Sequence, residues 1–245
     1  MSDAASSASG PTVVLVHGAF ADAGSWAFVT ERLVAAGVPV RAIVNPLRGI
    51  SHDAAYVASM INQIPGPVLA VGHSYGGAVI TNAVPRTGNV VGLVYVAAFA
   101  PDEGELLGDI VGRSKDSVLT SALEEYQYPT GNGSETATEV LIDAAKFRSV
   151  FTADLPQRQS DVYGLSQRPI AAGAFAEKSG PPAWKNLPVW AAVGTADTAA
   201  GADVVREMAQ RAGADITEIE GSHVIMISQP DAVTEVILKA RKSVS

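Results

Sequence analysis

The segment Gly72-His73-Ser74-Tyr75-Gly76 places a serine between glycines, where an apolar run ends and a helical pattern begins. A sharp turn between a strand and a helix strains the serine backbone and projects its hydroxyl from the edge of a sheet. The bare Gly-x-Ser-x-Gly pattern is common, and a serine after such a turn can instead be a helix N-cap. Because a strand precedes it and a helix follows it, we interpret Ser74 as a nucleophile.

A serine hydroxyl is a weak nucleophile until a base removes its proton, and histidine most often fills that role. The chain has four histidines: His17, His52, His73 and His223. His223 lies between the last predicted strand and the final helix, where its loop can lean over Ser74, so we interpret it as the base. For His17 and His73 we expect structural hydrogen bonds in loops, and His52 opens a predicted helix.

The base needs a carboxylate that fixes its tautomer and stabilises its charged form. Asp197 follows the predicted strand at 189–193, one strand before the loop of His223, and we interpret it as this acid. Asp102 and Glu103 are alternatives because they follow the predicted strand at 90–97. They lie beyond Pro101, several residues past the strand end, which makes their reach less favourable.

Acyl transfer also requires backbone amides that bind the developing oxyanion. The amide of Tyr75, first in its helix, is one predicted donor. The glycine-containing loop after the first strand predicts the other, Ala19, with Phe20 as the alternative. A substrate pocket near these loops would be mostly apolar, although the same side chains could equally be core. The side chains predicted to line it are Phe20, Tyr75, Phe99, Trp184 and Val224.

Short β-branched runs alternate with helical patterns along most of the chain, which predicts an α/β fold with a mostly parallel sheet and helices on both faces. The predicted strands are 12–16, 39–44, 68–71, 90–97, 189–193 and 215–219. Residues 102–186 are more polar, carry helical patterns such as 135–147, and show no convincing strand, so we expect an inserted helical cap. This leaves 11–101 and 187–245 as the core and 1–10 as a disordered lead.

The composition narrows the classes of partner. The 17 basic and 25 acidic residues give a formal net charge of −8, so nothing favours binding to nucleic acid or an anionic membrane. The apolar run at 90–100 is well short of the roughly 20 residues of a membrane span. Cysteine is absent, which excludes disulfides, thiolate metal sites and a cysteine nucleophile. The first ten residues do not read as a secretory signal, so we expect a cytoplasmic protein of undetermined oligomeric state.

The segments LVHGAF, GHSYGGAVI, VGTADT and GSHVIM occur in the order found in the α/β-hydrolase superfamily, and the resemblance covers residues 12–242. The chain most resembles bacterial esterase-like members and is more distantly similar to plant methylesterases and hydroxynitrile lyases. The resemblance implies a triad of Ser74, Asp197 and His223, an oxyanion hole from Ala19 and Tyr75, no metal or other cofactor, and a cap over the pocket.

Three positions depart from relatives within this superfamily. Val224 stands where (S)-selective plant lyases have a lysine, which disfavours cyanide chemistry. Ser74 stands where haloalkane dehalogenases and epoxide hydrolases have an aspartate. After Asp197 the chain continues Thr-Ala-Ala-Gly, which predicts a looser acid loop than that of related enzymes.

We therefore expect a serine hydrolase that cleaves small carboxylic esters through an acyl-enzyme. A member of the same fold that binds a ligand without hydrolysis, or that acts as a lyase or perhydrolase, is the alternative hypothesis.

Overall fold

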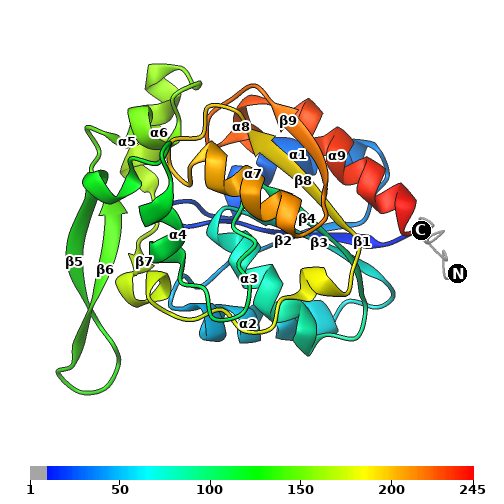
Figure 1. Ribbon diagram of the computed structural model, residues 1–245, viewed down its shortest axis with the longest axis horizontal. Coiled ribbons are helices and arrows are strands. Elements are labelled where there is room, and N and C mark those ends of the chain that lie inside the picture. Colours follow the sequence, from blue (N-terminus) through cyan, green and yellow to red (C-terminus); the bar gives the residue numbers. More distant parts are fainter. Residues whose placement is uncertain (1–9) are drawn as a thin grey trace, which may run out of the picture.

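The computed structural model describes residues 10–245 and has a central sheet of six parallel strands in the order β2-β1-β3-β4-β8-β9 (Figure 1). The strands are β1 (Thr12–Val16), β2 (Val40–Ile43), β3 (Val68–His73), β4 (Val90–Val96), β8 (Val189–Gly194) and β9 (Asp215–Ile219). The predicted parallel α/β architecture is confirmed. The predicted disordered lead lies, Gly10 apart, outside the described residues.

Helices cover both faces of this sheet (Figure 1). On one face α1 (Ala27–Ala35) packs against α9 (Pro230–Ser243), and on the other α2 (Ile50–Asn62) packs against α3 (Tyr75–Ala83). The helix α7 (Ala202–Arg211) packs against β8. The strands β3 and β8 have neighbouring strands on both sides and every one of their residues is buried, and such doubly covered strands read as continuous apolar runs.

The parallel arrangement determines where the candidate residues lie. The carboxyl ends of parallel strands share one edge of a sheet, and ligands bind beyond that edge. The loops that carry Ser74, Asp197 and His223 follow β3, β8 and β9, and the loop that carries Ala19 follows β1. The fold therefore brings these four loops to the same edge.

The chain between β4 and β8, which we call the insertion, contains both helices and strands. Its elements are α4 (Leu107–Arg113), β5 (Leu123–Pro129), β6 (Thr136–Ile142), α5 (Phe147–Phe151), α6 (Gln157–Ser166) and β7 (Ile170–Ala171). The strands β5, β6 and β7 form an antiparallel sheet, and the hairpin of β5 and β6 extends away from the core in Figure 1. The prediction of a purely helical insertion is wrong.

The misread segment is 135–147, which becomes β6 followed by the start of α5. Its β-branched residues fit a strand as well as a helix, and periodicity alone does not separate the two in so short a run. Val140 and Ile142 are buried at alternate positions, and the Thr130 amide donates to the Glu135 carbonyl (3.1 Å) to close the hairpin turn. Pairing with β5 thus decides the conformation.

The remaining helices are short. The helix α8 (Ile225–Ser228) follows His223, and 3₁₀ helices span Ala23–Trp26, Val84–Arg86, Leu119–Ala122, Ala172–Phe175 and Ala183–Lys185. From residue 10 to residue 245, every helix is too short or too polar to cross a bilayer. The cytoplasmic location stays a prediction.

Candidate active site

Ser74 occupies the turn between β3 and α3 with φ 52° and ψ −125°, a backbone conformation that residues other than glycine rarely adopt. Such backbone strain costs about 1–3 kcal/mol and persists only where the surroundings enforce it. Here the Ser74 amide donates to the Val96 carbonyl (3.3 Å), and the Ser74 carbonyl accepts from the amides of Gly77 (2.9 Å) and Phe99 (3.2 Å). Ser74 occupies the N-cap position of α3, but its side chain makes no capping bond, so capping does not explain a serine here.

Two glycines allow the loop after β1 to approach this turn. A Cβ atom on Gly18 would lie 2.6 Å from the Cβ of Ser74, and a Cβ on Gly76 would lie 2.4 Å from the Val16 carbonyl oxygen. Real Cβ atoms do not approach other heavy atoms so closely. The sequence His-Gly after β1 and Gly-x-Ser-x-Gly after β3 therefore fit together as one packed unit.

His223 and Asp197 form a buried pair at this edge, each only 1% exposed. The His223 Nδ1 atom lies 2.7 Å from Asp197 Oδ2, which places the imidazole proton on Nδ1. The other carboxylate oxygen, Oδ1, accepts from the amides of Ala199 (2.9 Å) and Ala200 (3.0 Å). The Thr198 hydroxyl is 3.2 Å from two carbonyls of the insertion, so the prediction of a loose acid loop is wrong.

The histidine lies beside the serine turn. The His73 Nε2–H donates to the His223 carbonyl (3.0 Å), and the two imidazole ring centroids are 4.8 Å apart. The structure thus brings His223 against the residue that directly precedes Ser74. The Ser74 hydroxyl itself has no hydrogen-bond partner among residues 10–245.

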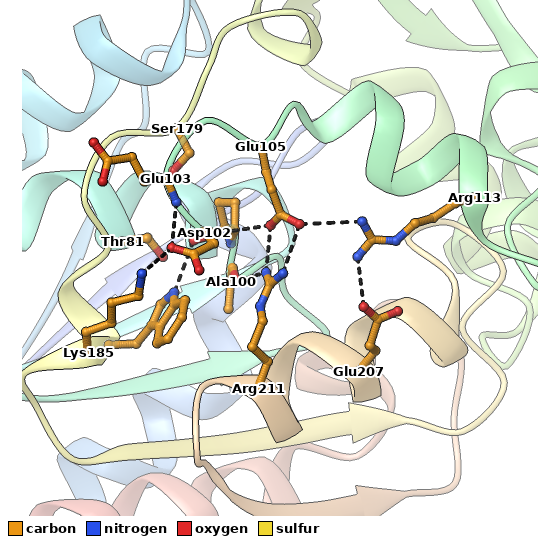
Figure 2. Close-up of polar contacts among 12 residues, drawn as sticks. Thr81, Ala100, Asp102, Glu103, Glu105, Arg113, Ser179, Lys185, Glu207 and Arg211 are labelled. Carbon is orange, nitrogen blue, oxygen red and sulfur yellow. Dashed lines mark hydrogen bonds and ion pairs between the residues drawn. The ribbon is translucent and has the colours of Figure 1, made fainter.

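Asp102 and Glu103, the alternative acids, lie elsewhere (Figure 2). The Asp102 carboxylate forms an ion pair with Lys185 (2.6 Å) and accepts from the Glu103 amide (2.7 Å). Hydrogen bonding to Lys185 lowers the pKa of Asp102, although this group lies at the surface. Of the three acids considered, Asp197 is the one that contacts a histidine.

Figure 2 also shows how the two ends of the insertion are held, and we call this region the junction. Glu105 forms ion pairs with Arg211 of α7 (2.6 Å) and with Arg113 of α4 (3.4 Å). The two connecting segments pair with each other, because the Gly104 amide donates to the Ser179 carbonyl (2.8 Å) and the Ser179 amide to the Glu105 carbonyl (3.0 Å). The junction therefore ties both connections to each other and to the core.

His17 and His73 have the structural roles expected of them. The His17 Nε2 accepts from the Asn45 amide (2.9 Å), so its Nδ1–H donates to the Gly18 carbonyl (2.8 Å), and both nitrogens of the neutral ring are satisfied. Burial lowers the pKa of His17 to about 4. Burial, followed by the neighbouring His223, lowers the pKa of His73 well below its ordinary value.

The lowered pKa values of His17 and His73 predict that the protein loses stability in mild acid. Between pH 6.5 and about 4 an unfolded histidine binds a proton that folded His17 does not, so the free energy of unfolding decreases as pH falls through this window. For His17 the loss is about 3 kcal/mol at pH 4 relative to pH 7. Urea unfolding across this range measures it. His17→Gln should flatten the pH dependence, whereas His52→Gln, at an exposed ring, should not; equal curves for all three proteins would contradict the assignment.

Free backbone amides lie on both sides of the serine. Among residues 10–245 the amides of Ala19, Phe20 and Tyr75 have no hydrogen-bond partner. The Tyr75 hydroxyl donates to the buried carboxylate of Asp53 (2.9 Å), which also accepts from the Arg48 amide (3.1 Å). This bond directs the Tyr75 ring toward α2 and leaves the backbone amide of Tyr75 beside Ser74.

A cavity of about 180 Å³ adjoins these loops. Phe20 and Val224, two of the residues predicted to line a substrate pocket, border it together with Phe147, Phe151 and Tyr163 of the insertion. The Phe151 ring centroid is 4.9 Å from that of His223 and 6.0 Å from that of Phe20. Phe151 thus forms both a wall of the cavity and a cover for His223, a role that the sequence analysis missed.

Three of the predicted lining residues, Tyr75, Phe99 and Trp184, do not border this cavity. The Trp184 indole N–H donates to the Pro101 carbonyl (3.1 Å), and its ring packs below Arg211 in the junction. Phe99 is buried beside the serine turn, where its amide binds Ser74. Phe99 follows the end of β4, and Trp184 lies where the insertion returns to the core. Both aromatic residues are therefore part of the packed interior.

The described residues contain no group of three or more His, Cys, Asp or Glu side chains that could hold a metal ion.

A family model described as alpha/beta hydrolase family matches residues 13–236. A pheophorbidase from Raphanus sativus is 27% identical over 150 residues, and the match covers 55% of this chain and 55% of that protein. The chain thus spans about half the length of this curated relative. A polyneuridine aldehyde esterase superposes with a TM-score of 0.77 at 19% identity, covering 94% of this chain and 98% of that one. An extracellular alpha/beta-hydrolase from a Paenibacillus species gives 0.73 at 21% identity, covering 94% and 99%. At these identities the superpositions show a shared fold.

Proposed function

Because the chain belongs to the α/β hydrolase family, we propose that it is a serine hydrolase that cleaves carboxylic esters of small molecules through an acyl-enzyme. The observation that carries this proposal is the buried His223–Asp197 pair (2.7 Å) beside the strained turn of Ser74. The esterase among the solved structures of the same fold agrees with the proposal.

In the proposed reaction, the Nδ1–H of His223 donates to Asp197 and leaves Nε2 free to accept the proton of Ser74. Ser74 Oγ then attacks the ester carbonyl, and the amides of Ala19 and Tyr75 bind the oxyanion. Each such donor stabilises the transition state by about 2.7–4 kcal/mol. His223 returns the proton to the leaving alcohol, and water, activated by the same base, releases the acid.

The free Ser74 hydroxyl is compatible with this sequence of steps. Hydrogen bonds between catalytic groups are often long or poorly aligned without substrate and shorten in the Michaelis complex. His223 is nearly inaccessible to solvent, so the imidazole is screened from water before substrate enters. The Phe151 ring packs against that of His223, so we expect Phe151 to move when substrate enters.

The test is hydrolysis of a panel of p-nitrophenyl esters, combined with labelling by a fluorophosphonate probe. We expect ester turnover and labelling of one serine per chain. Folded protein that neither hydrolyses any ester nor reacts with the probe would exclude the proposal.

The cavity predicts a limit on the size of the substrate. A cavity of about 150 Å³ lined by apolar side chains holds one benzene ring, so the cavity of about 180 Å³ described here suits a group of similar size. Replacing Phe151 by alanine removes the wall between this cavity and His223. We expect the ratio of kcat/KM for a C10 ester to that for a C4 ester to rise about tenfold, by relief of a clash worth roughly 1.4 kcal/mol.

The matched control is Tyr126→Ala, at an exposed aromatic residue of the hairpin in the same insertion. It should leave the ratio unchanged. A Phe151→Ala variant with the chain-length preference of the wild type would show that Phe151 does not limit the pocket.

A further inference from the structure

The loop that carries His223 is bound by a second carboxylate, Asp154, which belongs to the insertion. The Ser222 amide donates to Asp154 Oδ2 (2.9 Å), and the Ser222 hydroxyl donates to Asp154 Oδ1. Both oxygens of Asp154 are therefore used by the residue that directly precedes His223. Asp197 holds the imidazole ring of His223, whereas Asp154 holds the backbone from which that ring projects.

The contact is close and has a second component. A Cβ atom on Gly221 would lie 2.9 Å from Asp154 Oδ2, so glycine at this position lets the loop approach the carboxylate. The Ser222 hydroxyl is also 3.4 Å from the carbonyl oxygen of Phe151, whose ring covers His223. Residues 151–154 thus contact the histidine loop through both main-chain and side-chain atoms.

The segment that presents Asp154 is itself well fixed. The Leu155 amide donates to the Thr152 carbonyl (3.0 Å), and the buried hydroxyls of Thr152 and Ser160 lie 2.6 Å apart, which ties this turn to α6. Burial acts to raise the pKa of Asp154, but hydrogen bonds from Ser222 and Ser228 outweigh it and hold this pKa below the ordinary value. The carboxylate is therefore charged at neutral pH, and hydrogen bonds to it are strengthened by that charge.

We propose that Asp154 is a positioning residue for His223, so that the insertion contributes to the alignment of the base as well as to the pocket. This inference rests on the proposed function of His223. The mechanism is geometric, since Asp154 fixes the loop through Ser222 and makes no contact with the reacting atoms. A displacement of about 1 Å in a catalytic group can lower the rate by about 10²-fold.

The decisive variant is Asp154→Asn. Asparagine removes the negative charge and keeps one acceptor oxygen, so the charge-assisted bonds from the Ser222 amide and hydroxyl are weakened and the hydroxyl must turn from donor to acceptor. We expect kcat to fall about 10- to 100-fold with KM changed less than about threefold. Ser222→Ala retains the amide bond and should cost less, and the double variant should be no worse than Asp154→Asn because both changes remove the same contact. Asp161→Asn is the matched control, since the hydrogen bond that this exposed carboxylate of the insertion makes within residues 10–245 comes from Gln157 alone (2.7 Å).

A second measurement reads the position of His223 without any substrate. Proton–nitrogen correlation spectra of protein labelled with ¹⁵N-histidine, assigned with His223→Gln, report which ring nitrogen carries the proton. We expect one Nδ1–H tautomer in the wild type and in Asp161→Asn, and a mixture in Asp154→Asn. Unchanged kcat together with an unchanged tautomer would overturn the proposal. If the wild type hydrolyses no ester, the proposed function fails, whereas the spectra still decide whether Asp154 positions His223.

Discussion

Replacing Ser74 by alanine is expected to lower ester turnover by about a millionfold, to the level that binding and backbone amides alone provide. The reason is that no acyl-enzyme can form once the hydroxyl is absent, while the rest of the turn is unaffected. The measurement is kcat by stopped assay at high protein concentration, with fluorophosphonate labelling of the same sample. Labelling should disappear completely.

The matched control for this change is Ser59→Ala, at an exposed serine of α2 whose hydroxyl, in the described part of the chain, donates to the Tyr56 carbonyl alone (2.8 Å). It should retain full turnover and labelling. Residual labelling of the Ser74→Ala protein at the wild-type rate would place the nucleophile on another residue.

Replacing Asp197 by asparagine is expected to lower kcat about 10⁴-fold while leaving the fold intact. Asparagine can keep its carbonyl oxygen toward the amides of Ala199 and Ala200, as Asp197 Oδ1 does now. Its amide group then faces His223 Nδ1 and donates to it, so the imidazole proton moves to Nε2. The histidine can no longer accept the proton of Ser74.

Asp102→Asn serves as the comparison. It breaks an ion pair with Lys185 at the surface, and such pairs contribute little to stability. We expect kcat within about twofold of the wild type. Equal losses in both variants would mean that the geometry around His223 does not identify the acid.

The core of the fold could be predicted closely because its strands are doubly covered. The predicted strand at 12–16 has the bounds of β1, whose residues after Thr12 are all buried. A strand covered by helices on both faces consists mainly of apolar and β-branched residues, so it can be recognised in the sequence. The glycines and the polar residues of the candidate site lie in the loops that follow these strands. The same pattern located Ser74, Asp197 and His223, because each follows a strand end.

The insertion could not be predicted in the same way. The strand β5 is exposed along most of its length and lacks the alternation that marks a half-buried strand. Phe151 and Asp154 contact His223 and Ser222 only because the insertion folds back over the core, and no local pattern records that contact. An aromatic ring such as that of Trp184 suits an apolar pocket equally well from its sequence, but in the structure it packs into the junction.

The junction has a consequence for how small molecules reach Ser74. Since Glu105 is paired with Arg211 of α7 (2.6 Å) and the Gly180 amide donates to Asn82 of α3 (2.7 Å), a hinge rotation of the insertion as a rigid body would break the bonds that tie both connecting segments to the core. Rotation of the Phe151 ring and small shifts of α5 and α6 break none of them. Entry and exit of molecules should therefore proceed by rapid local breathing on the nanosecond-to-microsecond timescale of side chains and loops, not by slow opening of a lid.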